Sequence, residues 1–249
     1  MVKQLEGKVA LVTGASKGLG ASIAQALAAE GARVVVNFAG SKDAAEQVVR
    51  DIEAAGGTAI VVQANVSRPE DTIRLAEAAS DAFGKIDILV NNAGIYEYGS
   101  LAQVTPEAFH KIFDIDVLGL LLVTKETVAR MNNGGSIVNI GSLASSVNPP
   151  GTLLYAAAKH AADGITAVLS SELAERGIRV NSVNPGLIET EGTRAAGFFG
   201  GTLVEGYAGA ASLGIAGRPQ DIASIVTFLA GPEAAWINGQ VIVANGVQN

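Results

Sequence analysis

The sequence predicts a single α/β domain over residues 1–249, in which a doubly wound parallel sheet of about seven strands carries helices on both faces. Short apolar runs alternate along the chain with longer stretches of helical periodicity, as expected for right-handed crossovers between parallel strands. The length of 249 residues suits one undivided domain of this class. Aromatic residues make up only 5% and glycine contributes 30 residues, which favours close packing of helices on a sheet.

The apolar runs expected to form strands are 9–12, 33–38, 59–63, 86–90, 136–140, 179–183 and 240–244. Helical periodicity predicts helices near 18–30, 42–55, 69–83, 105–131, 155–175 and 219–230. Thr105 and Pro106 mark one helix start as an N-cap followed by a proline in the first turn, and Pro69 marks another. Ligands of such sheets bind at the carboxyl ends of the strands, so functional residues are expected in the loops that follow them.

The segment 190–214 does not fit this alternation, because it is rich in glycine and only weakly periodic. Long irregular segments in compact domains are usually functional lids or disordered. We interpret it as a substrate lid, with Phe198, Phe199 and Tyr207 as walls of the pocket. The alternative is a surface helix that places two phenylalanines in the core.

The charge and composition exclude several classes of function. A net charge of −7 and a pI near 4.9 argue against nucleic acid or an anionic membrane as a partner. Without cysteine, disulfides and thiolate chemistry are excluded, and the two histidines, His110 and His160, are not expected to bind a metal. There is no signal-peptide pattern and no apolar stretch of the roughly 20 residues that span a bilayer, so we expect a cytoplasmic protein.

A glycine-rich turn, Thr13-Gly14-Ala15-Ser16-Lys17-Gly18-Leu19-Gly20, follows the first expected strand. Its glycines permit a tight turn and a close approach of the backbone to a ligand. The N–H groups at the start of the following helix suit a pyrophosphate. The spacing Gly-x3-Gly-x-Gly differs from the commonest dinucleotide motif, so a plain strand-to-helix connection is the alternative to dinucleotide binding.

Tyr155 and Lys159 lie four residues apart in Tyr-Ala-Ala-Ala-Lys, and Ser142 precedes Tyr155 by thirteen positions. A spacing of four puts the phenol and the amine on one face of a helix. An ammonium held there favours a phenolate and lowers the pKa of a tyrosine from its ordinary value of about 10. A tyrosine of this kind can exchange a proton near neutral pH.

Together with the glycine-rich turn, these residues make the chain resemble the short-chain dehydrogenase/reductase family from Lys8 to about Gly246. The resemblance includes Asn91-Asn92-Ala93-Gly94 and Asn184-Pro185-Gly186-Leu187-Ile188-Glu189-Thr190, each after an expected strand. Four motifs in the family's order and spacing argue against a chance match. The resemblance implies a Rossmann-type fold and an enzyme that moves a hydride between a nicotinamide cofactor and a carbonyl or an alcohol.

The resemblance implies a catalytic role for Ser142, Tyr155 and Lys159. Tyr155 would donate a proton to the substrate carbonyl oxygen, and the Ser142 hydroxyl would polarise the same oxygen. Lys159 would lower the tyrosine pKa and hydrogen-bond the nicotinamide ribose. Asn92 would tie the central strands together.

The cofactor residues that the resemblance implies are Gly14, Ser16, Lys17, Gly18, Leu19, Gly20, Asn37, Ser41, Lys42, Asn65, Val66, Asn91, Ala93, Gly94, Tyr155, Lys159, Pro185, Gly186, Ile188 and Thr190. Enzymes that use NAD typically place an acid at the end of the second strand. Here Val36-Asn37-Phe38-Ala39-Gly40-Ser41-Lys42 has none, while Lys17 and Lys42 suit a 2′-phosphate. We therefore predict NADP(H) in preference to NAD(H). The alternative is that both lysines are solvated surface charges.

Asp116 departs from the family pattern, which usually has asparagine at this position. A carboxylate near Lys159 would favour the ammonium and partly offset its effect on Tyr155. We therefore predict that Asp116 changes the pH dependence of the reaction. The alternative is a solvated or capped aspartate with no kinetic effect.

Three functions compete. The first is an NADP(H)-dependent carbonyl reductase or alcohol dehydrogenase acting on a small molecule. The second is a similar enzyme with another substrate, either a 3-oxoacyl-[acyl-carrier-protein] reductase or a glucose, other sugar or polyol dehydrogenase. The basic patch for an acidic carrier protein, with Arg130, Arg176 and Arg179, is thin. The third, from another class, is a catalytically silent dinucleotide-binding protein. The resemblance also implies a homotetramer.

Overall fold

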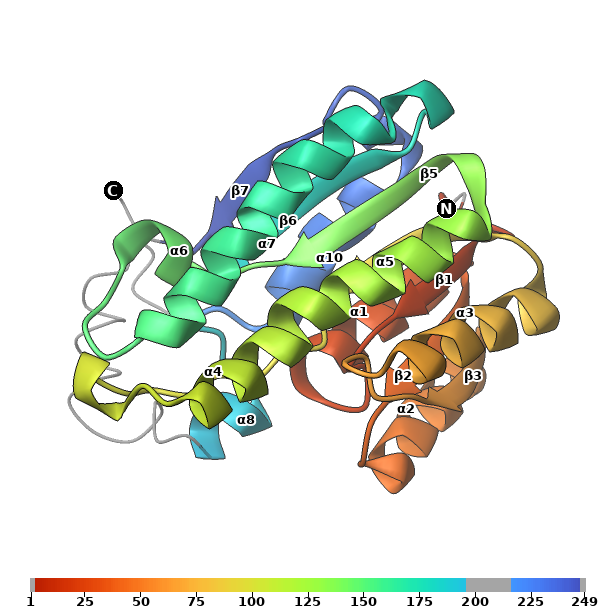
Figure 1. Ribbon diagram of the computed structural model, residues 1–249. Helices are drawn as coiled ribbons and strands as arrows, with labels where there is room; N and C mark the ends of the chain where they lie inside the picture. Colours follow the sequence, from red (N-terminus) through yellow and green to blue (C-terminus); the bar gives the residue numbers. More distant parts are fainter. Residues whose placement is uncertain (1–2, 196–215, 247–249) are drawn as a thin grey trace.

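In the computed structural model, which describes residues 3–195 and 216–246, seven parallel strands form one sheet. The strands are β1 Val9–Val12, β2 Arg33–Phe38, β3 Thr58–Gln63, β4 Ile86–Asn91, β5 Met131–Ile140, β6 Arg179–Pro185 and β7 Val241–Ala244. Their order, β3-β2-β1-β4-β5-β6-β7, places the reversal of winding between β1 and β4 (Figure 1). The predicted doubly wound sheet is therefore confirmed, and its switch point marks the expected ligand site.

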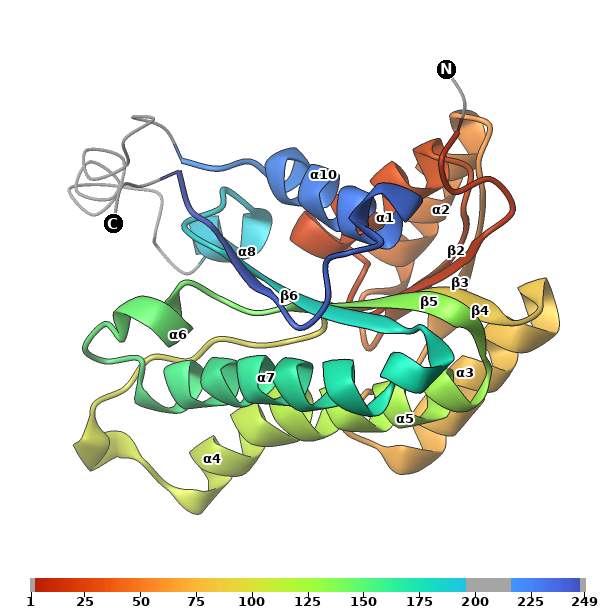
Figure 2. The same cartoon turned by 90° about the horizontal axis from the view of Figure 1, so that it is seen from above.

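Two layers of helices cover the sheet (Figure 2). One face carries α1 (Gly18–Ala29), α2 (Lys42–Ala54) and α10 (Pro219–Ala230). The other carries α3 (Pro69–Phe83), α5 (Leu120–Ala129) and α7 (Leu153–Glu172), with α4 (Pro106–Phe113) beyond α5. Two short helices, α6 (Ala144–Val147) and α8 (Glu191–Ala195), follow β5 and β6 at the carboxyl end of the sheet.

Successive strand residues supply two separate hydrophobic cores. In β1, Ala10 and Val12 face the core under α1 and α10, while Val9 and Leu11 face the core under α3 and α5. This follows from the period of two in a strand, which sends neighbouring side chains to opposite faces. Because both faces are buried, all four residues are apolar, and the run shows no alternation of apolar and polar residues.

The single helix predicted over 105–131 is wrong in detail. The structure has α4, then a π-helical turn over Asp114–Gly119, then α5, and Met131 already belongs to β5, where it pairs with Ile86 of β4. A π-helical turn accommodates one extra residue and often occurs at functional sites. Here it contains the buried Asp116, whose tertiary contacts no periodicity can reveal.

Part of the predicted lid lies outside the described residues. The structure describes its beginning, where α8 follows the Thr190 motif, but Phe198, Phe199 and Tyr207 lie outside the described part of the chain.

Within the described residues, no helix combines the length and the apolar character needed to cross a membrane. Over the same residues, no cluster of histidine, cysteine, aspartate and glutamate side chains is arranged to hold a metal ion.

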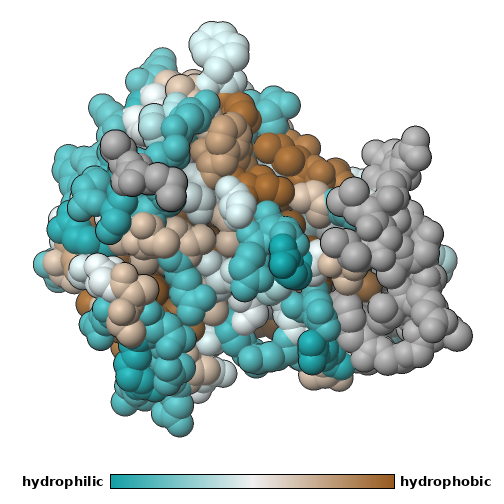
Figure 3. Space-filling view, turned by 180° about the vertical axis from the view of Figure 1, so that it is seen from behind, coloured by the Kyte–Doolittle hydropathy of each residue, from teal (hydrophilic) through white to brown (hydrophobic). Residues whose placement is uncertain are grey.

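Apolar side chains reach the surface at several places. Figure 3 shows hydrophobic surface gathered in the upper part of the face opposite that of Figure 1. Phe228 of α10 and Val241 and Val243 of the edge strand β7 are exposed. The single tryptophan of the chain, Trp236, lies in the connection between α10 and β7 and is 99% exposed.

Candidate active site

Ser142, Tyr155 and Lys159 line one cavity of about 500 Å³ at the carboxyl end of the sheet. Tyr155 and Lys159 lie one turn apart near the start of α7, with Lys159 Nζ 5.7 Å from the centre of the tyrosine ring. Ser142 follows β5, and its Oγ accepts a hydrogen bond from the Ala144 N–H at 3.1 Å. The structure thus brings together the three residues that the sequence singled out.

Lys159 is buried beside a carboxylate. Its Nζ lies 3.1 Å from Asp116 Oδ2 and donates a hydrogen bond to the Ile140 carbonyl at 3.2 Å. The other carboxylate oxygen of Asp116 accepts the Ile95 N–H at 2.8 Å, which ties the π-helical turn to the loop after β4. Asp116 is therefore buried and in contact with Lys159, which excludes a solvated aspartate, while its effect on the reaction stays a prediction.

The pKa of Lys159 is raised above its ordinary value. Burial alone would lower it, since removal from water disfavours the ammonium. The Asp116 carboxylate, Tyr155 and Asp163 together outweigh this penalty, and Asp116 contributes most among them. Because the ammonium and the carboxylate are in direct contact, Lys159 stays protonated throughout the neutral range.

The glycine-rich turn forms one wall of the same cavity, through Lys17, Gly18, Leu19 and Gly20. Gly18 has φ +56°, a conformation that favours glycine. At Gly20, a Cβ would lie 2.5 Å from both Asn92 Nδ2 and the Gly14 carbonyl oxygen. Within the described part of the chain, no side chain caps the N-terminus of α1. This wall therefore presents backbone and N–H groups, as a pyrophosphate requires.

Asn92 ties β4 to the glycine-rich turn, as predicted. Its Nδ2 donates to the carbonyls of Thr13 at 2.9 Å and Gly14 at 3.0 Å, and its N–H donates to Thr13 Oγ1. Gly94, two residues on, lies against the buried ion pair, because a Cβ there would be 2.8 Å from Asp116 Oδ2. The loop therefore connects the expected cofactor site to the catalytic residues.

Two predicted cofactor residues, Asn37 and Asn91, have buried side chains that bond to other groups of the protein. The Asn37 side chain is buried behind the glycine-rich turn, where it accepts the Gly14 N–H and donates to the Ala64 carbonyl. Asn91 is also buried, and its Nδ2 contacts Thr124 and Asn139 at 2.9 Å. The Asn37 side chain thus holds the glycine-rich turn, and the Asn91 side chain joins β4 to α5 and β5, so we expect neither to contact a cofactor directly.

The remaining predicted cofactor residues divide between two places. Pro185, Gly186, Ile188 and Thr190 line the cavity, and Thr190 lies against the glycine-rich turn, 3.5 Å from where a Cβ of Gly18 would be. Outside the cavity's described lining lie Gly14, Ser16, Ser41, Lys42, Asn65, Val66 and Ala93. Several of these are at the ends of β2 and β3, where the adenosine end of a dinucleotide would extend along the sheet edge.

Sequence reasoning missed two tyrosines beside Tyr155. The rings of Tyr96 and Tyr98 have their centres 6.5 Å and 6.4 Å from the Tyr155 ring and 6.4 Å from each other. Burial, followed by the neighbouring Tyr155, raises the pKa of Tyr96, so this phenol stays protonated at neutral pH. The signal available was their position directly after the Asn91-Asn92-Ala93-Gly94 motif, on the loop that faces the catalytic helix.

The histidines lie elsewhere. His160 Nδ1 lies 2.9 Å from the Ala156 carbonyl on the exposed side of α7, and His110 lies 3.4 Å from Asp114.

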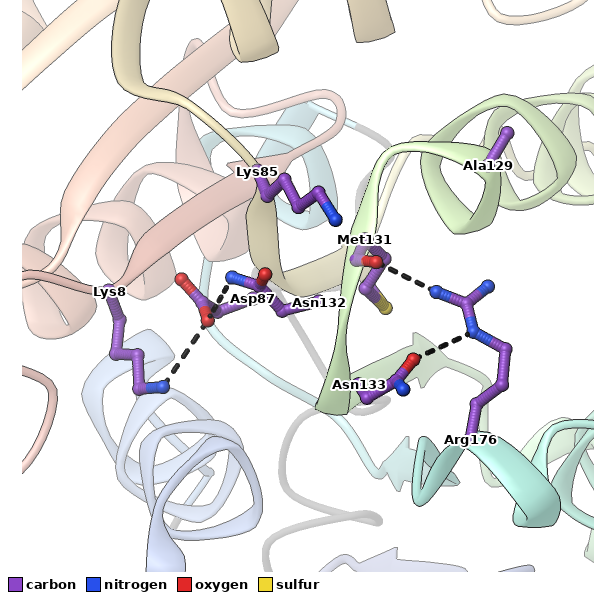
Figure 4. Close-up of a pocket in the computed structure, with 8 residues that line it drawn as sticks. All are labelled: Lys8, Lys85, Asp87, Ala129, Met131, Asn132, Asn133 and Arg176. Carbon is purple, nitrogen blue, oxygen red and sulfur yellow. Dashed lines mark hydrogen bonds and ion pairs between the residues drawn. The ribbon is translucent and has the colours of Figure 1, made fainter.

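A second cavity of about 590 Å³ lies at the opposite end of the sheet (Figure 4). It is lined by Lys8, Lys85, Asp87, Ala129, Met131, Asn132, Asn133 and Arg176, and its polar groups largely bond to one another.

Comparison with known proteins places this site in a family. The profile of the family described as enoyl-(acyl carrier protein) reductase matches residues 14–246. An uncharacterized oxidoreductase of Methylorubrum extorquens is 50% identical over 245 residues, covering 98% of this chain and 99% of the relative. A tetrahydroxynaphthalene reductase of Pyricularia oryzae is 36% identical over 253 residues, covering 97% of this chain and 89% of the relative.

The solved structures agree with the relatives. A short-chain dehydrogenase of Burkholderia cenocepacia in complex with NADP has a TM-score of 0.92 and 38% identity, and the match covers 98% of each chain. A similarity of this extent shows that the fold is shared over nearly the whole chain. The chain belongs to the short-chain dehydrogenase/reductase family.

Proposed function

We propose that the protein reduces a carbonyl to an alcohol, or catalyses the reverse, with NADP(H) as cofactor and Tyr155 as proton donor. The observation that carries the proposal is that Ser142, Tyr155 and Lys159 share one cavity with the glycine-rich turn. A proton donor, a second hydroxyl and a buried ammonium therefore meet where a dinucleotide would end.

The chain's own residues fit this cofactor. The glycine-rich wall admits a close backbone approach, and Lys17 is an exposed cation on the same wall. The strand β2 ends in Asn37-Phe38 without an acid, so no carboxylate repels a 2′-phosphate there. The Burkholderia cenocepacia relative, whose structure contains NADP, supports the same choice.

The chemistry that a bound nicotinamide would supply is hydride transfer to or from the carbonyl carbon. Tyr155 would give its phenolic proton to the carbonyl oxygen, and the Ser142 hydroxyl would donate a hydrogen bond to the same oxygen. Two donors aimed at a developing alkoxide in a partly dry cavity stabilise the transition state. Lys159 keeps a positive charge beside Tyr155, which favours loss of the phenolic proton. The Asp116 carboxylate partly offsets the effect of that charge on Tyr155.

For the substrate, the wall around Tyr155 favours a planar aromatic ketone. Tyr96 and Tyr98 are partly exposed within the cavity lining, and Val147, Pro149 and Pro150 add apolar surface beside them. Aromatic pairs prefer edge-to-face or offset contacts at the distances these rings already adopt. A relative named as a tetrahydroxynaphthalene reductase supports this class.

A carrier-protein substrate is the second candidate, because the matching family profile is described as an acyl-carrier-protein reductase. The arginines that would form its docking patch are already engaged. Arg130 pairs with Glu77 and Glu126, and Arg176 donates to the carbonyls of Val128 and Met131. We therefore place the small aromatic ketone first.

We also propose a cytoplasmic homotetramer. The π-helical turn, α5, α7 and β7 carry exposed apolar side chains that support contacts between copies, namely Leu118, Leu121, Val168 and Val243. The absence of a membrane-spanning helix among the described residues is compatible with the location.

The test is NADPH consumption with a panel of naphthols and tetralones, aliphatic ketones, sugars and an acetoacetyl thioester, for the parent protein and Tyr155→Phe. We expect the parent to turn over, with aromatic ketones best, and Tyr155→Phe to lose activity by about 1,000-fold while still binding NADPH. Tight NADPH binding without turnover of any substrate would instead support the silent binding protein. Tyr96→Ala should lower kcat/KM for the aromatic ketones more than for the aliphatic ones.

A further inference from the structure

A polar network, buried except at the half-buried Asp163 on which it is centred, lies next to Ser142. This residue stands on α7, one turn after Lys159, on the same side of the helix. Asp163 Oδ2 accepts the Ser145 hydroxyl at 2.7 Å, and both carboxylate oxygens contact Asn184 Nδ2, at 3.0 and 3.2 Å. Sequence reasoning missed Asp163, although its spacing from Lys159 was available.

The network continues through buried groups. Asn184 Nδ2 lies 2.9 Å from Ser145 Oγ, and Asn184 Oδ1 accepts the Ser182 hydroxyl at 2.7 Å. Ser182 and Asn184 are fully buried in β6, and Ser145 is 7% exposed. Buried polar groups are costly unless they are bonded, and a fully connected network fixes a single arrangement.

The network reaches Ser142 from both sides. Ser145 Oγ lies 3.0 Å from the Ser142 carbonyl, and the Ser145 N–H donates to the same carbonyl at 3.1 Å. Gly141, on the other side, packs against the Asn184 amide so closely that a Cβ would lie 2.7 Å from Asn184 Cγ. The Gly141 N–H donates to the Val183 carbonyl and the Leu143 N–H to the Pro185 carbonyl, both at 2.9 Å. These two backbone bonds also hold the Ser142 loop against β6.

We propose that Asp163 is a positioning residue for the reduction, because it holds the Ser142 loop against β6 through Ser145 and Asn184. The inference rests on the proposed carbonyl reduction, since its effect is read through Ser142. The Ser142 hydroxyl must point at one oxygen atom, and a displacement of about 1 Å from the productive geometry can cost a hundredfold in rate. A carboxylate that accepts two donors from two different elements restricts such a displacement.

Asp163 also contributes to the charge around Lys159. Its carboxylate helps to raise the pKa of Lys159, together with Asp116 and Tyr155. This contribution comes after that of the Asp116 carboxylate, so the larger effect of removing Asp163 is expected on Ser142.

The experiment is a double-mutant cycle on the holoenzyme with the best ketone of the panel. Asp163→Asn puts a donor where the network needs an acceptor, and Ser145→Ala removes the linking hydroxyl but keeps the charge. We expect each to lower kcat by about 10-fold to 100-fold with little change in the Kd for NADPH. In a Ser142→Ala background most of that loss should disappear, because the residue being positioned is gone.

Glu172→Gln, an exposed carboxylate on the same helix, is the matched charge control and should keep the parental kcat. Full parental kcat in both Asp163→Asn and Ser145→Ala would overturn the inference. An undiminished loss in the Ser142→Ala background would overturn it as well, since a general structural role predicts that result. If Asp163→Asn fails to bind NADPH, Ser145→Ala decides alone. A parent without turnover, in contrast, refutes the proposed function itself.

Discussion

Lys159 Nζ and Asp116 Oδ2 lie 3.1 Å apart in the wall of the active-site cavity, with both side chains almost fully buried. The carboxylate offsets the cost of burying the ammonium, and the Ile95 N–H binds its second oxygen. Removal of one partner from a buried pair leaves the other charge uncompensated, which costs about 3–5 kcal/mol. The pair thus links the stability of the site to its chemistry.

Asp116→Asn should shift the pH dependence of reduction. Loss of the negative charge lowers the pKa of Lys159 and favours release of the catalytic proton, so the alkaline limb of the kcat profile should move down by about one pH unit. The measurement is kcat against pH for the parent and the variant. Asp114→Asn, an exposed carboxylate of the same π-helical turn, is the control. Superimposable profiles of the parent and Asp116→Asn would show that Asp116 is electrostatically silent.

The same pair predicts a stability difference at high pH. Because the folded pKa of Lys159 is raised, the stabilisation is complete below the unfolded value of about 10.4 and is lost as the pH rises through the folded value. The free energy of unfolding of the parent should therefore exceed that of Asp116→Asn at pH 7 to 9. The two should converge above about pH 10.4. A constant difference across this range would contradict the assignment.

Lys17→Ala should weaken NADPH binding and leave NADH binding nearly unchanged. A lost charge-assisted bond to a 2′-phosphate corresponds to about a tenfold rise in the KM for NADPH. Lys42→Ala should have a smaller effect, because Glu46 Oε1 already lies 3.6 Å from its ammonium. Lys125→Ala, on α5, controls for net charge. Equal effects on both cofactors would remove the claim for a 2′-phosphate contact.

Asp71→Asn should destabilise the protein at neutral pH but not in acid. The Asn65 N–H, accepted at 2.8 Å, and the Arg74 guanidinium hold the pKa of Asp71 below its ordinary value, although burial opposes them. The stabilisation, about 1 kcal/mol, is therefore present above about pH 4 and is lost as the pH falls through the folded pKa. Urea unfolding at pH 7 and pH 3 measures it, with Asp81→Asn on the same helix as control. A difference that persists at pH 3 would refute this account.

Two glycine substitutions near the active site should have opposite signs. Gly141→Ala drives a Cβ into the Asn184 amide and should cost about 3 kcal/mol of stability together with most of the activity. Gly164→Ala lies within α7 with nothing within 4 Å of its added Cβ, and should gain about 1 kcal/mol from helix propensity. Thermal unfolding of both variants decides, and a destabilised Gly164→Ala would show that its surface is already packed.

The fold and the meeting of Ser142, Tyr155 and Lys159 in one cavity were predictable because each has a local signal. Buried strands read as apolar runs, Thr105 and Pro106 mark a helix start, and the spacing of Tyr155 and Lys159 fixes their common face. Strand and helix bounds differ from prediction mainly at their ends, where propensity decides least.

What the sequence did not reveal depends on tertiary contacts. The π-helical turn at Asp114–Gly119 is set by what Asp116 meets across the loop after β4, and the aromatic wall depends on how Tyr96 and Tyr98 fold back onto Tyr155. Asn37 looked like a cofactor contact because it lies near the end of β2. In the structure its side chain accepts the Gly14 N–H and donates to the carbonyls of Val62 and Ala64. Periodicity carries no information about such partners.

The exposure of Trp236 gives the protein an intrinsic optical probe. As the only tryptophan of the chain, it accounts for the whole indole emission, and in an isolated copy its ring is surrounded by water. Contact with a second copy at this edge would move the emission maximum to shorter wavelength and shield the ring from iodide. The tryptophan emission of the unlabelled protein, recorded over a dilution series, can therefore follow assembly at concentrations too low for light scattering.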